Sequence, residues 1–374
     1  MNSPLTGGVL AAPASGAGDT AELRQLVHDI ARQAYERRFG HRGVPDELDS
    51  ALWTDVETTG LTRLTTTLDL GAGPEEAAVV LHGLARWAGA VPVAETDLLA
   101  GWLAERAGIE VPDEGPLTVA IADGTLDDGR AAGQAADVPW ARDCATILVV
   151  LRTPTGVLAG RLQRADATLT SRHNLAGEPR DHIEFDIPAG TFTPLEPALV
   201  DELIRRGAWA RCGQIIGALD AVSLSTKAHV SERVQFGRPL GKFQSAQQAL
   251  SMMAGNIERA RAAATLAVGA AAEYGFGSAQ TDYALTIAKV TLGRTVGPAT
   301  TIAHQLHGAI GVTAEHHLWL FSMRALSWIT EFGSTAHYAR RIGTAVLNSE
   351  NSWDVLIGND FGQWESLNSR GAQQ

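Results

Sequence analysis

The sequence predicts a mainly α-helical protein with a small central β-domain, and three observations lead to this fold class. Long runs with helical apolar periodicity fill both ends of the 374-residue chain. Between them lie short β-branched or alternating runs that turn residues separate. The length is sufficient for two or three domains with cores of their own. We predict a disordered tail at 1–18, a helical domain at 19–112, a β-domain at 113–195 and a four-helix bundle at 196–374.

The N-terminal tail and the composition set limits on the class of protein. Residues 1–18 are rich in Ala, Gly, Ser and Pro and lack the basic segment and apolar core of a signal peptide. The net charge of −12 argues against a nucleic-acid partner. No apolar stretch reaches the ~18 residues of a membrane span. Cys144 and Cys212 lie far apart, which is typical of reduced thiols. We therefore expect a soluble, cytoplasmic protein.

Four helices are expected in the N-terminal domain. The first begins at Asp19 and Glu22, which have capping-box spacing, and ends at Gly40. The second, VPDELDSALWTDVETTGL, has Pro45 at its start, and the third, GPEEAAVVLHGLARWAGAV, begins near Pro74. The fourth is ETDLLAGWLAERAG. This domain carries no cluster of catalytic residue types.

The central segment changes from helical to strand-like patterns. The predicted strands are LTVAIADG, CATILVVLRT, GVLAGRLQ and HIEFDIPAG. The stretch GQAADVPWARDCATILVV is interpreted as a loop that leads into a buried strand. A block of this length predicts one compact sheet.

The C-terminal segment contains four long amphipathic runs with short joints, which predict an antiparallel bundle. They are ALVDELIRRGAWARCGQIIGALDAVSLSTKAHVSERVQ, FQSAQQALSMMAGNIERARAAATLAVGAAAEYG, QTDYALTIAKVTLGRTVGPATTIAHQLHG and HHLWLFSMRALSWITEFGSTAHYARRIGTAVL. The many Ala and Gly residues allow the helices to approach closely.

Two motifs stand at the joints of this bundle. ERVQFGRPLGKFQ separates the first and second helices, and QLHGAIGVTAEHHLWLFSMRA separates the third and fourth, about 60 residues later. In the first motif, Gly237 and Pro239 predict a rigid break between two helices. Either motif alone would be a weak signal, whereas the two in this order are specific.

The domain order and the two motifs resemble the acyl-CoA dehydrogenase family of flavoproteins, over nearly the whole chain. This resemblance implies an acyl-CoA dehydrogenase-like fold, an acyl-CoA substrate, and electron-transfer flavoprotein as the electron acceptor. It also implies assembly with a homologous subunit as a dimer or a dimer of dimers. The implied cofactor is FAD, held by Arg233, Gln235, Phe236, Leu240, Gln244, Gln305, Gly308 and Ala309.

The resemblance assigns roles to several of these residues. Arg233 would hold the FAD pyrophosphate, since a guanidinium offers forked donors. Gln305 would bond the adenosine end, and Gly308 would allow close backbone approach. Ala309 departs from the family, which has a second Gly there. The simpler interpretation is a helix corner in which Arg233 pairs with an acid.

The flavin side of the predicted site is less complete. The family has an aromatic residue followed by a Thr or Ser in the β-domain, and the matching place here has Trp140 with neither. Two further candidates, His304 and His307, have no metal-ligand partners at useful spacing, so we expect no metal and interpret both as packing or surface residues.

The catalytic base is the main departure from the family. Removal of an α-proton needs a positioned carboxylate, and both family positions fall on glycine, at Gly333 and Gly207. Glu331 is the internal candidate, with a solvated or ion-paired loop carboxylate as the preferred interpretation. The chain thus resembles the base-lacking subunits of actinobacterial heteromeric members linked to sterol or fatty acid degradation. The alternative is a flavin-free structural or regulatory homologue.

Overall fold

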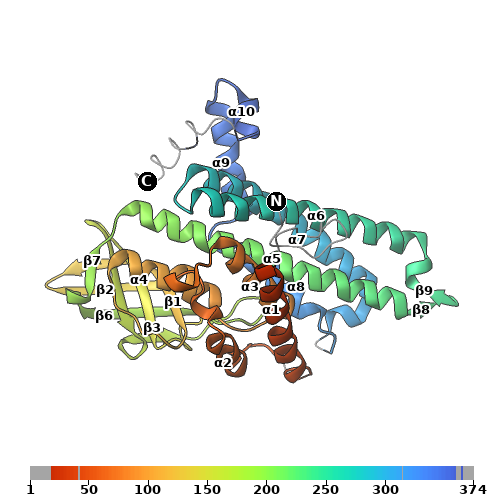
Figure 1. Ribbon diagram of the computed structural model, residues 1–374, viewed down its shortest axis with the longest axis horizontal. Coiled ribbons are helices and arrows are strands. Elements are labelled where there is room, and N and C mark those ends of the chain that lie inside the picture. The colour runs from red at the N-terminus through yellow and green to blue at the C-terminus, as the bar shows by residue number, and fades with distance from the viewer. Residues whose placement is uncertain (1–17, 41–42, 314, 359–363, 365–374) are drawn as a thin grey trace. The chain divides into compact units, whose positions relative to one another are not determined.

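The computed structural model describes residues 18–40, 43–313, 315–358 and 364 (Figure 1). Apart from residue 18, the predicted disordered tail lies outside the described residues. The chain divides into two compact units. One contains the residues up to 31, 74–88 and those from 208 onward; the other contains 32–73 and 89–207. The four predicted domain ranges stay a prediction.

The helices occupy most of the described chain, and the strands are confined to its middle. The α-helices are α1 (Gly18–Arg37), α2 (Ser50–Thr58), α3 (Pro74–Arg86), α4 (Trp102–Ala107), α5 (Pro197–Glu232), α6 (Gln244–Tyr274), α7 (Ala279–His307), α8 (Leu318–Trp328), α9 (Thr335–Asn348) and α10 (Ser352–Leu356). The strands of the large sheet are β1 (Leu117–Asp127), β2 (Arg130–Pro139), β3 (Thr146–Thr153), β4 (Gly156–Gln163), β5 (Ala167–Thr170), β6 (Arg180–Pro188) and β7 (Phe192–Pro194). A helical protein with one central sheet is the predicted fold class, which the model confirms.

The start of α2 differs from the prediction. The helix begins at Ser50 and not at Pro45, because Asp49 caps it: its carboxylate accepts a hydrogen bond from the Leu52 amide at 3.0 Å. The predicted fourth helix of the N-terminal domain also differs, since a π-helical segment at Glu95–Gly101 precedes α4. Helix capping is a local signal, and here it outweighs the favourable position of proline in a first turn.

The seven strands form one mixed sheet in the order β5-β6-β2-β1-β3-β4-β7. The pair β1 and β3 is parallel, whereas the other neighbours are antiparallel. The interpretation of GQAADVPW as a loop is wrong, because residues 130–139 form strand β2 between β1 and β6. Its Ala and Gly residues have low strand propensity, and pairing on both sides overrides that preference.

The C-terminal helices pack on one another, with α6 running along α7 and α7 contacting α8 and α9 (Figure 1). The fourth predicted helix is broken into α8 and α9. Phe332 and Gly333 have φ angles of 53° and 109°, which a continuous α-helix cannot contain. Ser334 then caps α9 by accepting a hydrogen bond from the His337 amide. The break creates a short loop at 329–334.

Buried charged side chains connect α3, α5 and α6 within the unit that contains residues 74–88 and those from 208 onward. Asp220 of α5 pairs with Arg261 of α6 and lies 2.8 Å from Nε2 of His82 of α3. All three residues are at most 8% exposed. A buried carboxylate is tolerated only when its oxygens are paired in this way. Within the described part of the chain, no helix is both long and apolar enough to cross a membrane.

Candidate cofactor and active site

The joint between α5 and α6 is a small closed hairpin. Strands β8 (Val234–Gln235) and β9 (Arg238–Pro239) pair across a two-residue turn. The turn residues Phe236 and Gly237 both have positive φ, of 51° and 77°, which is the requirement of a type I′ turn. Behind it, the amide of residue 240 donates to the carbonyl of residue 233 at 2.8 Å. The backbone of the first motif is therefore fixed by its own hydrogen bonds.

The side chains of this hairpin are mostly exposed. Phe236 is 93% exposed, and Arg238 stacks its guanidinium over Phe243 at 4.1 Å. Arg233 is exposed and makes no ion pair within the described ranges. The interpretation of Arg233 as a helix-corner residue paired with an acid is therefore not supported by the described residues. An exposed guanidinium on a fixed backbone can accept an anionic ligand.

The remaining candidates of the first motif lie on the same short stretch. Gln235 is an exposed residue of β8, Leu240 is partly buried beyond β9, and Gln244 is the exposed first residue of α6. Their closeness follows from the hairpin itself.

The second motif begins where α7 ends. Gly308 has φ 66° and ψ −146°, a conformation that an L-residue with a side chain rarely adopts, and a Cβ placed there would meet nothing within 4 Å. Gln305 and Ala309 are exposed beside it. Gly311, in contrast, is required by packing, because a Cβ there would lie 2.7 Å from Cβ of His307. The exposed face at 305–309 is thus open to a ligand.

Trp140 does not present its ring to a ligand pocket in this structure. It is 3% exposed and packs with Ala90 and Cys144 in a small core cluster. Nearby, burial raises the pKa of Asp143 to about 6, with the charge of Asp181 adding to the effect and that of Arg142 opposing it. Sequence reasoning missed Asp143, and no local pattern distinguishes it from any other loop carboxylate.

Glu331 lies in the loop between α8 and α9 and is an ion-pair partner. Its Oε2 accepts a hydrogen bond from Nε of Arg211 at 2.6 Å, and the two side chains are 17% and 2% exposed. Its backbone carbonyl accepts from Nζ of Lys289 at 2.9 Å, as does that of Ile329. Burial lowers the pKa of Lys289 to about 8, while the charge of Glu331 opposes that shift. The carboxylate is therefore paired with buried Arg211 and acts electrostatically on buried Lys289.

The two glycines at the family's base positions have different surroundings. At Gly333, with φ 109°, a Cβ would lie 2.8 Å from the ring of Tyr338, so a longer side chain would be strained and crowded. Gly207 is buried within α5. One turn earlier, Glu202 is bonded to Arg206 at 2.9 Å. Neither position carries a group that could accept a proton.

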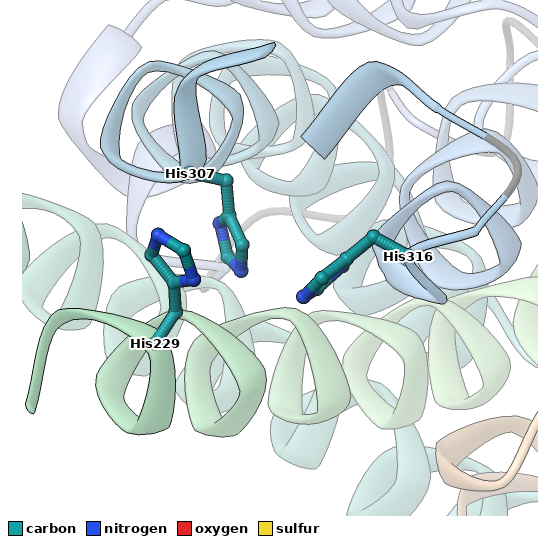
Figure 2. Close-up of side chains that lie close together, drawn as sticks. All are labelled: His229, His307 and His316. Carbon is teal, nitrogen blue, oxygen red and sulfur yellow. The ribbon is translucent and has the colours of Figure 1, made fainter. Parts of the chain in front are cut away.

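Three histidines lie close together in the C-terminal unit (Figure 2). They are His229 near the end of α5, His307 at the end of α7, and His316 just before α8. In the sequence, no other histidine of the cluster lies at metal-ligand spacing from His307. For this reason the sequence did not reveal the cluster. His304 instead lies 3.1 Å from the hydroxyl of Ser322.

The comparisons with known proteins find similarity to acyl-CoA dehydrogenases. Residues 198–347 match the family model of the acyl-CoA dehydrogenase C-terminal domain. The chain is 26% identical to acyl-CoA dehydrogenase IpdE2 of Mycolicibacterium smegmatis over 345 residues, which cover 87% of this chain and 99% of that protein.

Solved structures share the fold. The ChsE4-ChsE5 complex of Mycobacterium tuberculosis matches with a TM-score of 0.78 and 21% identity, covering 91% of this chain and 99% of that one. The Tcur3481-Tcur3483 steroid ACAD, solved as a variant, matches with a TM-score of 0.74 and 23% identity, covering 86% and 97%. These likenesses confirm the predicted fold type.

Proposed function

We propose that this chain is a member of the acyl-CoA dehydrogenase family and the base-lacking subunit of a heteromeric FAD-dependent enzyme that introduces an α,β double bond into acyl-CoA thioesters. The observation that carries the proposal is the exposed, unpaired guanidinium of Arg233 on a hairpin with a fixed backbone.

The exposed groups of the two motifs fit the ADP half of FAD. A pyrophosphate needs a cation with forked donors, and Arg233 offers one without having to break an ion pair. Gln244 and Gln305 are exposed amides that can bond the cofactor's polar edges. The open space around Gly308 allows a ligand to touch the backbone. When bound, FAD would accept the hydride from the substrate β-carbon.

The carboxylate needed to remove the α-proton is proposed to come from another subunit. Gly333 and Gly207 have no side chain to supply it. The carboxylate of Glu331 forms an ion pair with Arg211, and its negative charge also opposes the burial that lowers the pKa of Lys289. A carboxylate in an ion pair is a weak base, because the neighbouring cation stabilises its charged form.

The relatives support the rest of the proposal. One of the matched structures is a complex of two named chains, and another is described as a steroid ACAD. We propose a homologous acyl-CoA dehydrogenase subunit as the partner, in a dimer or dimer of dimers. A sterol-derived or fatty acyl-CoA is the proposed substrate, electron-transfer flavoprotein the acceptor, and the cytoplasm the compartment, with buried Cys144 and Cys212 as free thiols.

The test is co-expression with a homologous acyl-CoA dehydrogenase subunit, followed by flavin content and turnover with an artificial electron acceptor. The mixed complex should be yellow and active, and the isolated chain inert, since loss of a general base lowers rates about 10²–10⁴-fold. Arg233→Ala should weaken FAD binding at least about 10-fold and leave the far-UV circular dichroism unchanged. Arg259→Ala, an exposed arginine of α6, is the matched control.

Three results would contradict the proposal. Turnover by the isolated chain would place the base within it. A mixed complex that purifies without flavin would favour the flavin-free structural homologue. An Arg233→Ala variant with unchanged FAD affinity would remove Arg233 from the cofactor site, and with it the observation that carries the proposal.

A further inference from the structure

The cluster of His229, His307 and His316 has the layout of a metal-ligand set. The ring centroid of His307 lies 4.4 Å from that of His229 and 4.6 Å from that of His316. The ring centroids of His229 and His316 are 6.1 Å apart. Each ring offers one nitrogen, and these nitrogens lie within 4.8 Å of one another. Figure 2 shows the three rings converging from separate segments of the chain.

The hydrogen bond of His307 fixes which nitrogen is available. Its Nδ1 lies 2.8 Å from the carbonyl oxygen of Ala303, which can only accept, so Nδ1 carries the proton. Nε2 is left as a lone-pair acceptor. It is buried and has no hydrogen-bond partner within the described chain, on a residue that is 5% exposed. Histidines that bind metals usually donate their other ring N–H to a carbonyl in this manner.

The surroundings keep all three rings neutral. Burial lowers the pKa of His307 to about 4, and the neighbouring His229 and His316 add to this shift. Burial also lowers the pKa of His229 and of His316. Neutral imidazole is the form that coordinates a metal, so little proton release is required.

We propose that His229, His307 and His316 bind one divalent transition-metal ion, with Zn²⁺ as the preferred occupant. Imidazole nitrogens suit zinc, and three of them leave a fourth tetrahedral position for water. Zinc–nitrogen distances of about 2.0–2.1 Å place the ligand nitrogens about 3.4 Å apart. The present separations, which all lie within 4.8 Å, must therefore shorten by at most about 1.4 Å, and the two partly exposed rings, His229 and His316, can rotate to achieve this.

His316 requires one further adjustment. Its Nδ1 accepts a hydrogen bond from the Leu318 amide at 3.2 Å, so its proton is on Nε2 in the neutral ring. Coordination through Nε2 moves that proton to Nδ1 and gives up this long hydrogen bond. In return, the buried lone pair of His307 gains a partner.

The ion would connect segments that are distant in sequence. It would tie the last turn of α5 to the joint between α7 and α8, in the same unit. This inference does not depend on the proposed enzymatic function, because the ligands belong to this chain and the test needs no flavin.

The experiment uses the full-length chain after treatment with a chelator. Calorimetric titration with Zn²⁺ should show one ion per chain, and Co²⁺ should give the visible absorption of a tetrahedral site. His229→Ala and His316→Ala should each weaken Zn²⁺ binding by more than about 10-fold, since even the loss of an outer partner costs 10–100-fold. His337→Ala, an exposed histidine outside the cluster, should bind as the unmodified chain does.

A second measurement guards against misfolded variants. At one fixed Zn²⁺ concentration, the melting temperature of the unmodified chain and of the His337→Ala control should rise clearly more than that of the two cluster variants. The proposal is overturned if the unmodified chain shows no saturable binding of one ion. It is also overturned if either folded cluster variant retains the unmodified affinity.

Discussion

Replacement of Glu331 by glutamine separates its structural role from a catalytic one. Glu331 is the acidic partner of Arg211, whose side chain is 2% exposed, and its charge also acts on buried Lys289. Glu331→Gln keeps the shape and one acceptor oxygen but removes the negative charge. Buried Arg211 and Lys289 then lose the negative charge that compensates them.

The size of the effect follows from burial. Removing one partner of a fully buried ion pair costs about 3–5 kcal/mol. The retained acceptor of glutamine and the 17% exposure of Glu331 reduce this, and we expect about 2 kcal/mol of destabilisation. For a chain of 374 residues, that lowers the melting temperature by about 2–3 °C.

The assay is thermal unfolding followed by circular dichroism, with turnover of the mixed complex measured in parallel. Glu273→Gln, an exposed carboxylate of α6, is the matched control and should change the melting temperature by less than about 1 °C. The double variant with Arg211→Met and Glu331→Leu should be more stable than the summed effects of the single variants Arg211→Met and Glu331→Leu predict, because apolar pairs can replace buried ion pairs.

The reasoning is refuted by one pattern of results. If Glu331→Gln melts like the unmodified chain and abolishes turnover while flavin content is unchanged, then Glu331 acts as the base. The ion pair with Arg211 would then contribute little to stability, and the partner-supplied carboxylate would be unnecessary.

Two further predictions concern the same unit. Burial alone would raise the pKa of Asp220, but its hydrogen bonds to a histidine and to Arg261 outweigh this and hold the pKa at about 2, below the ordinary 3.8. The ionised Asp220 therefore contributes about 2 kcal/mol to the free energy of unfolding above pH 4, and this contribution is lost as the pH falls towards 2. Asp220→Asn should remove this part of the acid dependence of stability, measured by urea unfolding from pH 5 to 2. Gly293→Ala should lower stability by about 1–3 kcal/mol in the same assay, because its Cβ would lie 2.0 Å from Oγ1 of Thr335, whereas Gly297→Ala meets nothing within 4 Å and should not destabilise.

Local patterns were sufficient for the order and type of most elements. The apolar patterns of α5, α6 and α7 were readable because α6 and α7 each bury one face, whereas α5 buries almost every residue from 207 to 222. The two motifs were found for a similar reason: Gly237, Pro239 and Gly308 impose backbone conformations on their own segments. Such signals depend only on residues that are neighbours in the sequence, so they can be recognised without knowledge of the tertiary structure.

Other features depend on residues far apart in the sequence. Strand β2 exists because β1 and β6 pair with it on both sides, although its own residues favour a loop. The break between α8 and α9 accompanies the pairing of Glu331 with Arg211, a residue 120 positions earlier. No local sequence pattern at Glu331 or at Arg211 indicates that the two residues form a pair.

The candidate sites divide in the same way. The exposed hairpin of Arg233 was predictable, because the motif is contiguous and its turn fixes its geometry. The three-histidine cluster was not, since its members come from the ends of α5 and α7 and from the segment before α8. Contiguous residues bring their geometry with them, whereas a set gathered from separate helices exists only after those helices have packed.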